Sequence, residues 1–256
     1  MDRRLDEKIR RLRGALEQAR KLCVLTGAGA SAESGVPVYR GNEGLYRAFS
    51  AADISSPEGF ARNPEKVWQW YNERRRQLLE LKPNAGHVAL ARLEQSFVAS
   101  PALPGAGKRR SFRLVTQNID GLHQAAGSRD PVEVHGNIWK TRCTACAHVA
   151  DTYGQLFDGP PRCTRCGAMC RPHIVWFGEL LEPEVWDAAV RAAAMCDLLL
   201  AVGTSAVVQP AASLVHVAVG AGAMVAEINL EETPNTRWVD LSLLGKCGDI
   251  LPQLIE

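Results

Sequence analysis

Short apolar runs that recur along the chain limit the folds it can adopt. Residues 22–25, 112–116, 198–202 and 224–228 are four such runs, and the first ends in Thr-Gly. Segments with helical periodicity or composition separate them, such as residues 184–194 and 211–219. A short apolar run closed by glycine is typical of a buried parallel strand. Strands that alternate with helices need right-handed crossovers, so we predict an α/β fold with a doubly wound parallel sheet.

Two segments interrupt this alternation. Residues from about 36 to 80 contain helical material but no strand-like run, and residues from about 140 to 175 contain paired cysteines. We therefore expect both segments outside the sheet, as a smaller second domain. The predicted division is a sheet domain of residues 1–35, 82–138 and 178–256, a helical insert of residues 36–81, and a cysteine-containing insert of residues 139–177.

The composition excludes several classes of partner. The net charge is only +2, which gives little electrostatic basis for binding nucleic acid or an anionic membrane. Residues 198–226 carry no charged side chain, but Gly203, Pro210 and His216 interrupt them, so we expect a buried strand, a turn and a helix rather than a membrane span. The charged N-terminus is unlike a secretory signal, so a reducing, cytoplasmic location is expected.

Four of the eight cysteines form two C-x-x-C pairs, Cys143 with Cys146 and Cys163 with Cys166. Sixteen residues separate the pairs, which is a spacing typical of four-cysteine zinc sites. Four thiolates complete a tetrahedron and leave no open position, so one Zn²⁺ ion here would be structural. Cys170 follows closely and could compete as a ligand.

A glycine-containing segment, GAGASAESG, follows the first predicted strand at residues 27–35. Glycines there let a backbone approach a pyrophosphate, and the N–H groups at a helix start can hold the anion. The segment departs from the dinucleotide fingerprint because Ala32 stands where a third glycine belongs, so an ordinary turn is the alternative.

Polar residues follow the second predicted strand. Asn118 and Asp120 offer an amide and a carboxylate at a strand end, where ligands bind in such sheets, although Asp120 could instead cap a helix. His135, in Val-His-Gly, could act as a base near neutral pH, although a single histidine is more often structural.

Seven motifs in order make the chain resemble the sirtuin family over residues 15–255: GAGASAESGVPVYRG, TQNIDGLH, VHGN, the paired C-x-x-C, RPHIVWFGE, GTS followed by QPA, and INLE. The resemblance implies a Rossmann-like domain with a small zinc-binding domain. It also implies an enzyme that uses NAD as a co-substrate to remove acyl groups from protein or peptide lysine, releasing nicotinamide and O-acyl-ADP-ribose.

The resemblance also implies roles for individual residues. His135 resembles the general base, Asn118 would hold the reactive ribose or a water, and Asp120 would fix the carboxamide of nicotinamide. Tyr39 stands where the family usually has phenylalanine. The implied NAD contacts are Gly27, Ala28, Gly29, Ala30, Glu33, Ser34, Pro37, Arg40, Tyr46, Gln117, Asn118, Ile119, Asp120, His135, Gly203, Thr204, Ser205, Asn229, Leu230, Glu231 and Cys247. The strand expected to pair with the substrate peptide comprises Val175, Trp176, Phe177, Gly178 and Glu179.

Tyr71 and Arg74 resemble the Tyr-x-x-Arg pair of sirtuins that prefer succinyl, malonyl or glutaryl lysine. Helical spacing would place them on one face, where the arginine could bind a carboxylate at two points. The alternative is a solvated charge run, Arg74–Arg76. Plain deacetylation, ADP-ribosyl transfer to protein, a non-catalytic NAD sensor and a zinc-ribbon nucleic-acid binder remain competing functions.

Overall fold

The computed structural model describes residues 3–37, 51–99 and 110–255. Its larger sheet has six parallel strands in the order β3-β2-β1-β7-β8-β9. The strands are β1 (Lys21–Thr26), β2 (Ser111–Thr116), β3 (Val132–Glu133), β7 (Leu198–Val202), β8 (Met224–Asn229) and β9 (Leu241–Leu244). The predicted α/β fold is thus confirmed, and each of the four predicted runs is a strand of this sheet.

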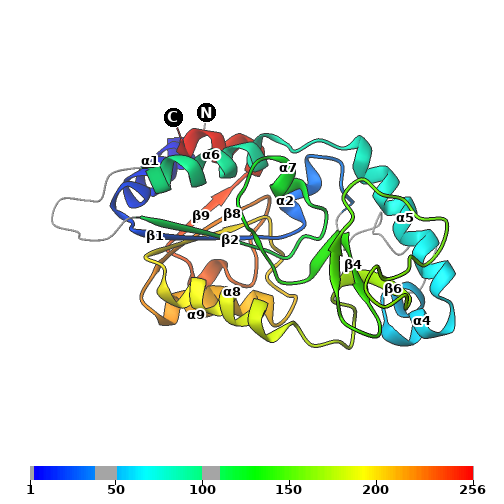
Figure 1. Ribbon diagram of the computed structural model, residues 1–256. Coiled ribbons are helices and arrows are strands. Elements are labelled where there is room, and N and C mark those ends of the chain that lie inside the picture. Colours follow the sequence, from blue (N-terminus) through cyan, green and yellow to red (C-terminus); the bar gives the residue numbers. More distant parts are fainter. Residues whose placement is uncertain (1–2, 38–50, 100–109, 256) are drawn as a thin grey trace.

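Helices cover both faces of the large sheet (Figure 1). One face packs against α1 (Arg3–Gln18), α6 (Ala85–Ala99), α10 (Cys247–Ile250) and the 3₁₀ helix η3 (Leu251–Leu254). The other face packs against α8 (Pro183–Met195), the 3₁₀ helix η1 (Ala211–Ser213) and α9 (Leu214–Gly220). Every residue of β7 is buried because apolar layers lie above and below it.

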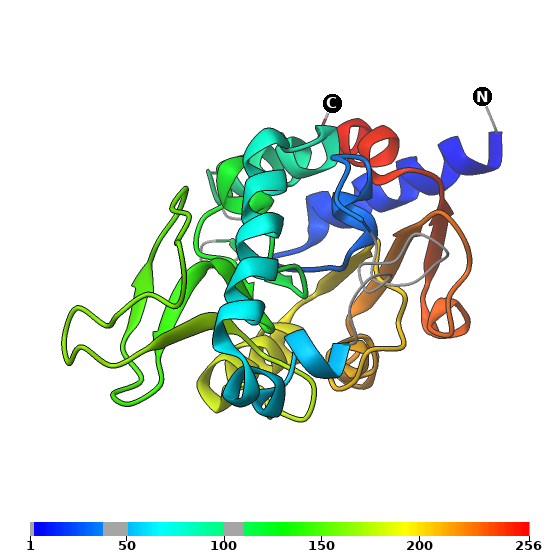
Figure 2. The same ribbon diagram turned by 90° about the vertical axis from the view of Figure 1, so that its right-hand side faces the viewer.

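A second unit lies beside the carboxyl ends of the large sheet (Figures 1 and 2). Its helices are α3 (Ala51–Ile54), α4 (Pro57–Arg62) and α5 (Pro64–Glu80). Its antiparallel sheet has the order β5-β4-β6, with strands β4 (Gly136–Cys143), β5 (Val149–Asp151) and β6 (Cys170–Ile174). The Asn63 side chain accepts a hydrogen bond from the Lys66 amide, and Pro64 occupies the first turn, so the start of α5 is well defined.

An aromatic core joins α5 to the small sheet. It contains Trp68, Tyr71, Trp139 and Trp176. Arg75 is completely buried beside this core and donates hydrogen bonds to the carbonyls of residues 138 and 155 and to the hydroxyl of residue 152. The alternative of a solvated run of three arginines is therefore wrong at Arg75, because the packing of α5 on the small sheet buries this side chain.

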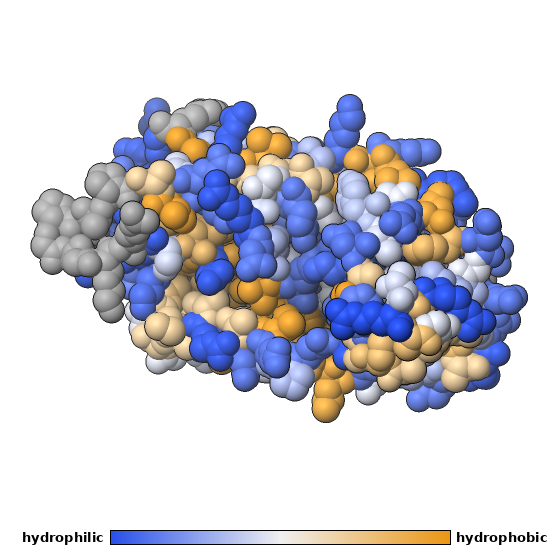
Figure 3. All heavy atoms as spheres, in the orientation of Figure 1, coloured by the Kyte–Doolittle hydropathy of each residue, from blue (hydrophilic) through white to orange (hydrophobic). Residues whose placement is uncertain are grey.

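No helix in the described part of the chain is long and apolar enough to cross a membrane. The uncharged segment 198–226 forms β7, η1, α9 and the start of β8, as the strand–turn–helix interpretation predicts. The face of the molecule in Figure 3 is a mixture of hydrophilic and apolar side chains.

Candidate active site

Residues that follow or end three strands, β2, β7 and β8, meet at the carboxyl edge of the large sheet. Gln117 follows β2, Thr204 follows β7, and Asn229 ends β8. The Gln117 amide donates to Thr204 Oγ1 at 3.1 Å, and the Asn229 amide donates to the Thr204 carbonyl at 2.9 Å. Parallel strands bring their carboxyl ends to one edge, so the sheet itself assembles these separate motifs.

The glycine-containing turn after β1 packs tightly against the turn after β7. Gly203 has φ +59°, and a Cβ there would lie 2.3 Å from the Ala30 nitrogen. A Cβ on Gly27 would lie 2.8 Å from the Gly203 oxygen, and the Gly29 amide donates to that same oxygen at 2.8 Å. Ala28 directly precedes the short helix α2 (Gly29–Ala32), which contains Ala30. The glycines are therefore required by the approach of the two turns.

Asn118 and Asp120 are linked through Ser31. The Asn118 amide donates to the Gly27 carbonyl and to Ser31 Oγ, both at 3.0 Å, and the Ser31 hydroxyl donates to Asp120 Oδ2 at 2.7 Å. Burial raises the pKa of Asp120, although hydrogen bonds from the Leu122 amide and Ser31 act in the opposite direction. Because α7 (Leu122–Ala125) begins at Leu122, Asp120 also fixes the start of that helix.

His135 lies between the two sheets, directly before β4. Its Nδ1 is 3.0 Å from the Gln117 carbonyl, and its own carbonyl accepts from the Val175 amide at 3.0 Å. A carbonyl can only accept, so Nδ1 carries the hydrogen and Nε2 presents a lone pair. Burial lowers the pKa of His135, despite an opposing effect of the Gln117 hydrogen bond. The geometry suits a neutral base whose acceptor nitrogen is Nε2.

Two buried histidines, which the sequence reading did not single out, lie beneath these residues. His87 Nδ1 accepts a hydrogen bond from the backbone amide of Asn84. The single hydrogen of the neutral ring is therefore on Nε2, which donates to Ser31 Oγ at 3.3 Å. His123 Nε2 lies 2.9 Å from Thr26 Oγ1. The two rings meet edge to face at 4.8 Å. Burial lowers the pKa of His87 to about 4 and that of His123 to about 3, so both are neutral at physiological pH.

Because protonation of these histidines is unfavourable in the folded state, stability should fall with decreasing pH. An unfolded histidine titrates near pH 6.5, so the unfolded chain binds more protons below that value. Each of His87 and His123 should remove about 1.4 kcal/mol of unfolding free energy per pH unit between pH 6.5 and its folded pKa.

Urea unfolding at pH 7 and pH 5 measures this loss. The double variant His87→Asn/His123→Asn should show a pH dependence smaller by about 4 kcal/mol over that interval, because its two side chains do not titrate there. An unchanged pH dependence in the variant would show that the two rings titrate in the native protein as they do in the unfolded chain.

Glu33 and Cys247, two of the predicted NAD contacts, lie together. The Glu33 carboxylate accepts from the Gly248 amide at 2.9 Å and from the Cys247 thiol at 3.2 Å. Glu33 therefore ties the start of α10 to the turn after β1. The predicted contacts Ser205, Leu230 and Glu231 are exposed after β7 and β8.

The Ser34 hydroxyl belongs to another of the predicted NAD contacts. This hydroxyl is buried and has no hydrogen-bond partner among the described residues, so a polar ligand could satisfy it. Pro37 is exposed, and the Ile119 carbonyl is occupied by the Ile138 amide at 2.8 Å. Tyr39, Arg40 and Tyr46 lie outside the described residues.

The predicted substrate residues lie on α5 and directly after β6. Tyr71 is buried, and its hydroxyl accepts from the Trp176 indole at 2.8 Å. Arg74 is partly buried and stacks over the Trp70 ring at 5.1 Å, while Trp70 meets Tyr71 edge to face. Trp70 thus places Tyr71 and Arg74 on one side of α5. Residues 175–179 follow β6 and include the exposed Phe177 and Gly178.

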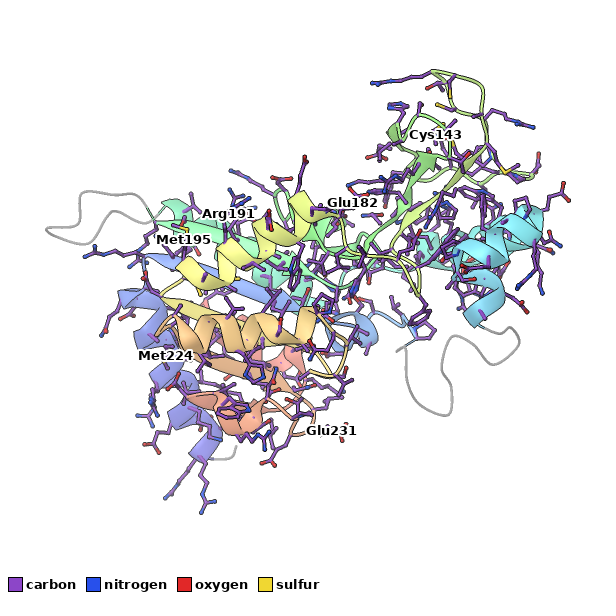
Figure 4. The ribbon with its side chains drawn as sticks, turned by 90° about the horizontal axis from the view of Figure 1, so that it is seen from below. Cys143, Glu182, Arg191, Met195, Met224 and Glu231 are labelled. Carbon is purple, nitrogen blue, oxygen red and sulfur yellow. The ribbon has the colours of Figure 1, made fainter. Side chains whose placement is uncertain are left out.

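The four paired cysteines form one cluster. The sulfur atoms of Cys143, Cys146, Cys163 and Cys166 all lie within 4.8 Å of one another. Figure 4 shows Cys143 in the small domain, away from Glu182 at the start of α8. Four thiols at these separations suit one tetrahedral zinc ion. Cys170 is buried beside the cluster but is not one of its four members.

Comparisons with known proteins match most of the chain. The Sir2 family model matches residues 27–210. An NAD-dependent protein deacylase of Thermus thermophilus is 46% identical over 237 residues, covering 93% of this chain and 90% of the relative. A solved complex of a Sir2 homologue with NAD is 40% identical, with a TM-score of 0.83, and the match covers 96% of this chain and 92% of that one.

A third relative is a solved Sir2 structure with a deacetylated p53 peptide and 3′-O-acetyl ADP-ribose. It is 30% identical, with a TM-score of 0.80, and the match covers 96% of this chain and 97% of that one. Together with the fold, the four-cysteine cluster and the assembled strand ends, these similarities span nearly the whole molecule. The chain therefore belongs to the Sir2 family of NAD-dependent protein deacylases.

Proposed function

We propose that the enzyme removes acidic acyl groups, namely succinyl, malonyl or glutaryl, from lysine in proteins, and that it also removes acetyl. The observation that carries the acyl preference is the position of Tyr71 and Arg74. The Tyr71 hydroxyl lies 2.8 Å from the indole nitrogen of Trp176, within the segment expected to bind the peptide. Arg74 contacts the same Trp70 ring as Tyr71, and its Nη1 also donates to Gln77 Oε1 at 2.9 Å, so a phenol and a guanidinium lie close to one ring.

The chemistry needs one base and several fixed polar groups. NAD, when bound, supplies the ADP-ribosyl acceptor for the acyl group and releases nicotinamide. His135 would accept the proton of a ribose hydroxyl at Nε2, since Nδ1 is held by the Gln117 carbonyl. Asn118 would hold the ribose or a water, and Asp120 would hold the nicotinamide carboxamide. Ser31 contacts both side chains and so fixes their relative position.

Mass spectrometry of matched peptides tests the function directly. One peptide would carry acetyl-lysine or succinyl-lysine and be incubated with the enzyme, with and without NAD. We expect NAD-dependent loss of both groups, with succinyl removed faster. Loss of acetyl alone would retain the deacylase mechanism and reject the acid-tail pocket. Loss of neither group, with NAD still bound, would favour the sensor function instead.

Substitution of Arg74 tests the acyl preference. Arg74→Met should lower kcat/KM for succinyl-lysine by about 10- to 100-fold, the range expected when a hydrogen bond to a charged group is removed, while acetyl-lysine turnover is retained. Arg76→Met is the matched control, because Arg76 is exposed two residues further along α5 and pairs with Glu73. Equal loss on both substrates would instead mean that Arg74 maintains the structure of α5.

A further inference from the structure

The Trp176 indole connects the segment expected to bind the peptide with Tyr71 of the proposed acyl pocket. Trp176 is only 3% exposed, and its ring lies 5.5 Å from the ring of Phe60. Its indole nitrogen donates to the Tyr71 hydroxyl at 2.8 Å. An indole nitrogen can only donate, so in this pair the phenol oxygen must be the acceptor.

Arg171 of β6 stacks on the ring of Trp176. The guanidinium carbon lies 3.5 Å from the centre of the Trp176 ring. Nη1 and Nη2 both donate to the Glu179 carboxylate, and Nη2 also donates to the Ile174 carbonyl at 2.8 Å. One oxygen of Glu179 accepts from the Trp176 amide as well, at 2.8 Å. Stacking and the two-point ion pair together fix both the ring and the backbone of Trp176.

The charge state of Glu179 agrees with this arrangement. Burial raises the pKa of its carboxyl group, but the hydrogen bonds from Arg171 and from the Trp176 amide outweigh burial, and the net effect is a lowered pKa. Glu179 is therefore ionised at neutral pH, and the pair with Arg171 is complete. Both side chains are mostly shielded from water, with exposed fractions of 16% for Arg171 and 24% for Glu179.

We propose that Arg171 is a positioning residue for acyl selectivity, which it exerts by holding the Trp176 indole against the Tyr71 hydroxyl. This inference rests on the proposed preference for acidic acyl groups. With the indole donating to it, the phenol oxygen keeps its own hydrogen directed away from Trp176, and Ser55 Oγ lies 3.4 Å from the same oxygen. A fixed phenol gives a defined direction for donation to the acyl carboxylate. Without Arg171, the indole can rotate and that direction is lost, even though Tyr71 and Arg74 are unchanged.

A double-mutant cycle on substrate preference tests the proposal. The measured quantity is the ratio of kcat/KM for succinyl-lysine to kcat/KM for acetyl-lysine in one peptide. Arg171→Met should lower this ratio about tenfold, as expected for one lost hydrogen bond to a charged group, and should lower it much less when Tyr71→Phe is already present. Arg171→Lys should also lower the ratio, because lysine lacks the planar fork. Arg142→Met, which removes another arginine–glutamate pair of the small domain, should leave it unchanged.

The outcomes separate this inference from the proposed function. If Tyr71→Phe and Arg74→Met lower the ratio but Arg171→Met does not, the acid-tail pocket stands and the role of Arg171 is rejected. If Arg171→Met lowers the ratio equally with and without the Tyr71 hydroxyl, Arg171 acts by another route. If neither Tyr71→Phe nor Arg74→Met changes the ratio, the proposed acyl preference itself fails.

A second variant covers the case in which Arg171→Met does not fold, which thermal melting would show. Trp176→Phe keeps an aromatic ring between Arg171 and Phe60 and removes the indole N–H. It should lower the succinyl-to-acetyl ratio in the presence of Tyr71 and not in the Tyr71→Phe background. An unchanged ratio in Trp176→Phe would overturn the proposal.

Discussion

His135→Ala should reduce deacylation at least about a hundredfold, the usual scale for loss of a general base. The Nδ1 atom of His135 is 3.0 Å from the Gln117 carbonyl, which leaves Nε2 as the proton acceptor. Burial lowers the pKa of the ring, so it stays unprotonated at neutral pH. An alanine supplies neither the lone pair nor the fixed geometry, and the buried histidines His87 and His123 cannot replace it, because each uses Nε2 within the buried network.

Steady-state kinetics with an acyl-lysine peptide would measure the loss, and calorimetric titration would measure NAD binding. His216→Ala is the matched control, because His216 is an exposed histidine of α9 whose ring contact is with Trp238. It should retain wild-type turnover. We expect His135→Ala to retain NAD binding while losing turnover. Near-normal turnover in His135→Ala would reject its assignment as the base.

The large sheet could be predicted from the sequence because its central strands are buried on both faces. Such strands appear as continuous apolar runs, as in residues 198–202, where every side chain is buried. β3, with only residues 132–133, is too short to give a pattern. α6 was also missed as a helix. Its buried residues include His87, Glu94 and several small residues around its circumference, so no single apolar stripe marks it.

The candidate site was predictable where one motif follows one strand and less so where partners come from distant segments. The placement of Asn118 and Asp120 after β2 was expected, but their link through Ser31 joins residues nearly ninety positions apart. Arg75 illustrates the same limit. Its sequence neighbours are charged, whereas its contacts are Trp68 on the same helix and acceptors at residues 138, 152 and 155. Burial of this kind depends on tertiary packing, which local sequence does not encode.

Removal of the metal should unfold the small domain and abolish deacylation. Cys143 ends β4 and pairs in register with Cys170 of β6, while Cys146, Cys163 and Cys166 lie in the connections between these strands. In a three-stranded sheet of this size, the metal–thiolate bonds supply a large part of the folding free energy. Structural zinc contributes about 10–16 kcal/mol in zinc-finger peptides.

Chelation followed by elemental analysis and hydrogen exchange would measure this effect. Loss of one zinc per chain should be accompanied by fast exchange of the amides in residues 139–177. Cys143→Ser should reproduce it, and Cys170→Ser is the matched control, since Cys170 is a buried neighbour outside the four-sulfur cluster. A zinc-free protein with full activity and unchanged exchange would refute the structural role of the metal.

Unfolding of the small domain should disturb the position of His135, because two backbone connections link this residue to the small sheet. β4 begins at Gly136, directly after His135, and Gly136 pairs in register with Ile174 at the end of β6. The next amide, that of Val175, donates to the His135 carbonyl at 3.0 Å. The backbone on both sides of the proposed base is therefore held by the small sheet. Loss of that sheet would leave the hydrogen bond between His135 Nδ1 and the Gln117 carbonyl as the main restraint on the imidazole. We therefore expect turnover to be lost while the larger sheet stays folded.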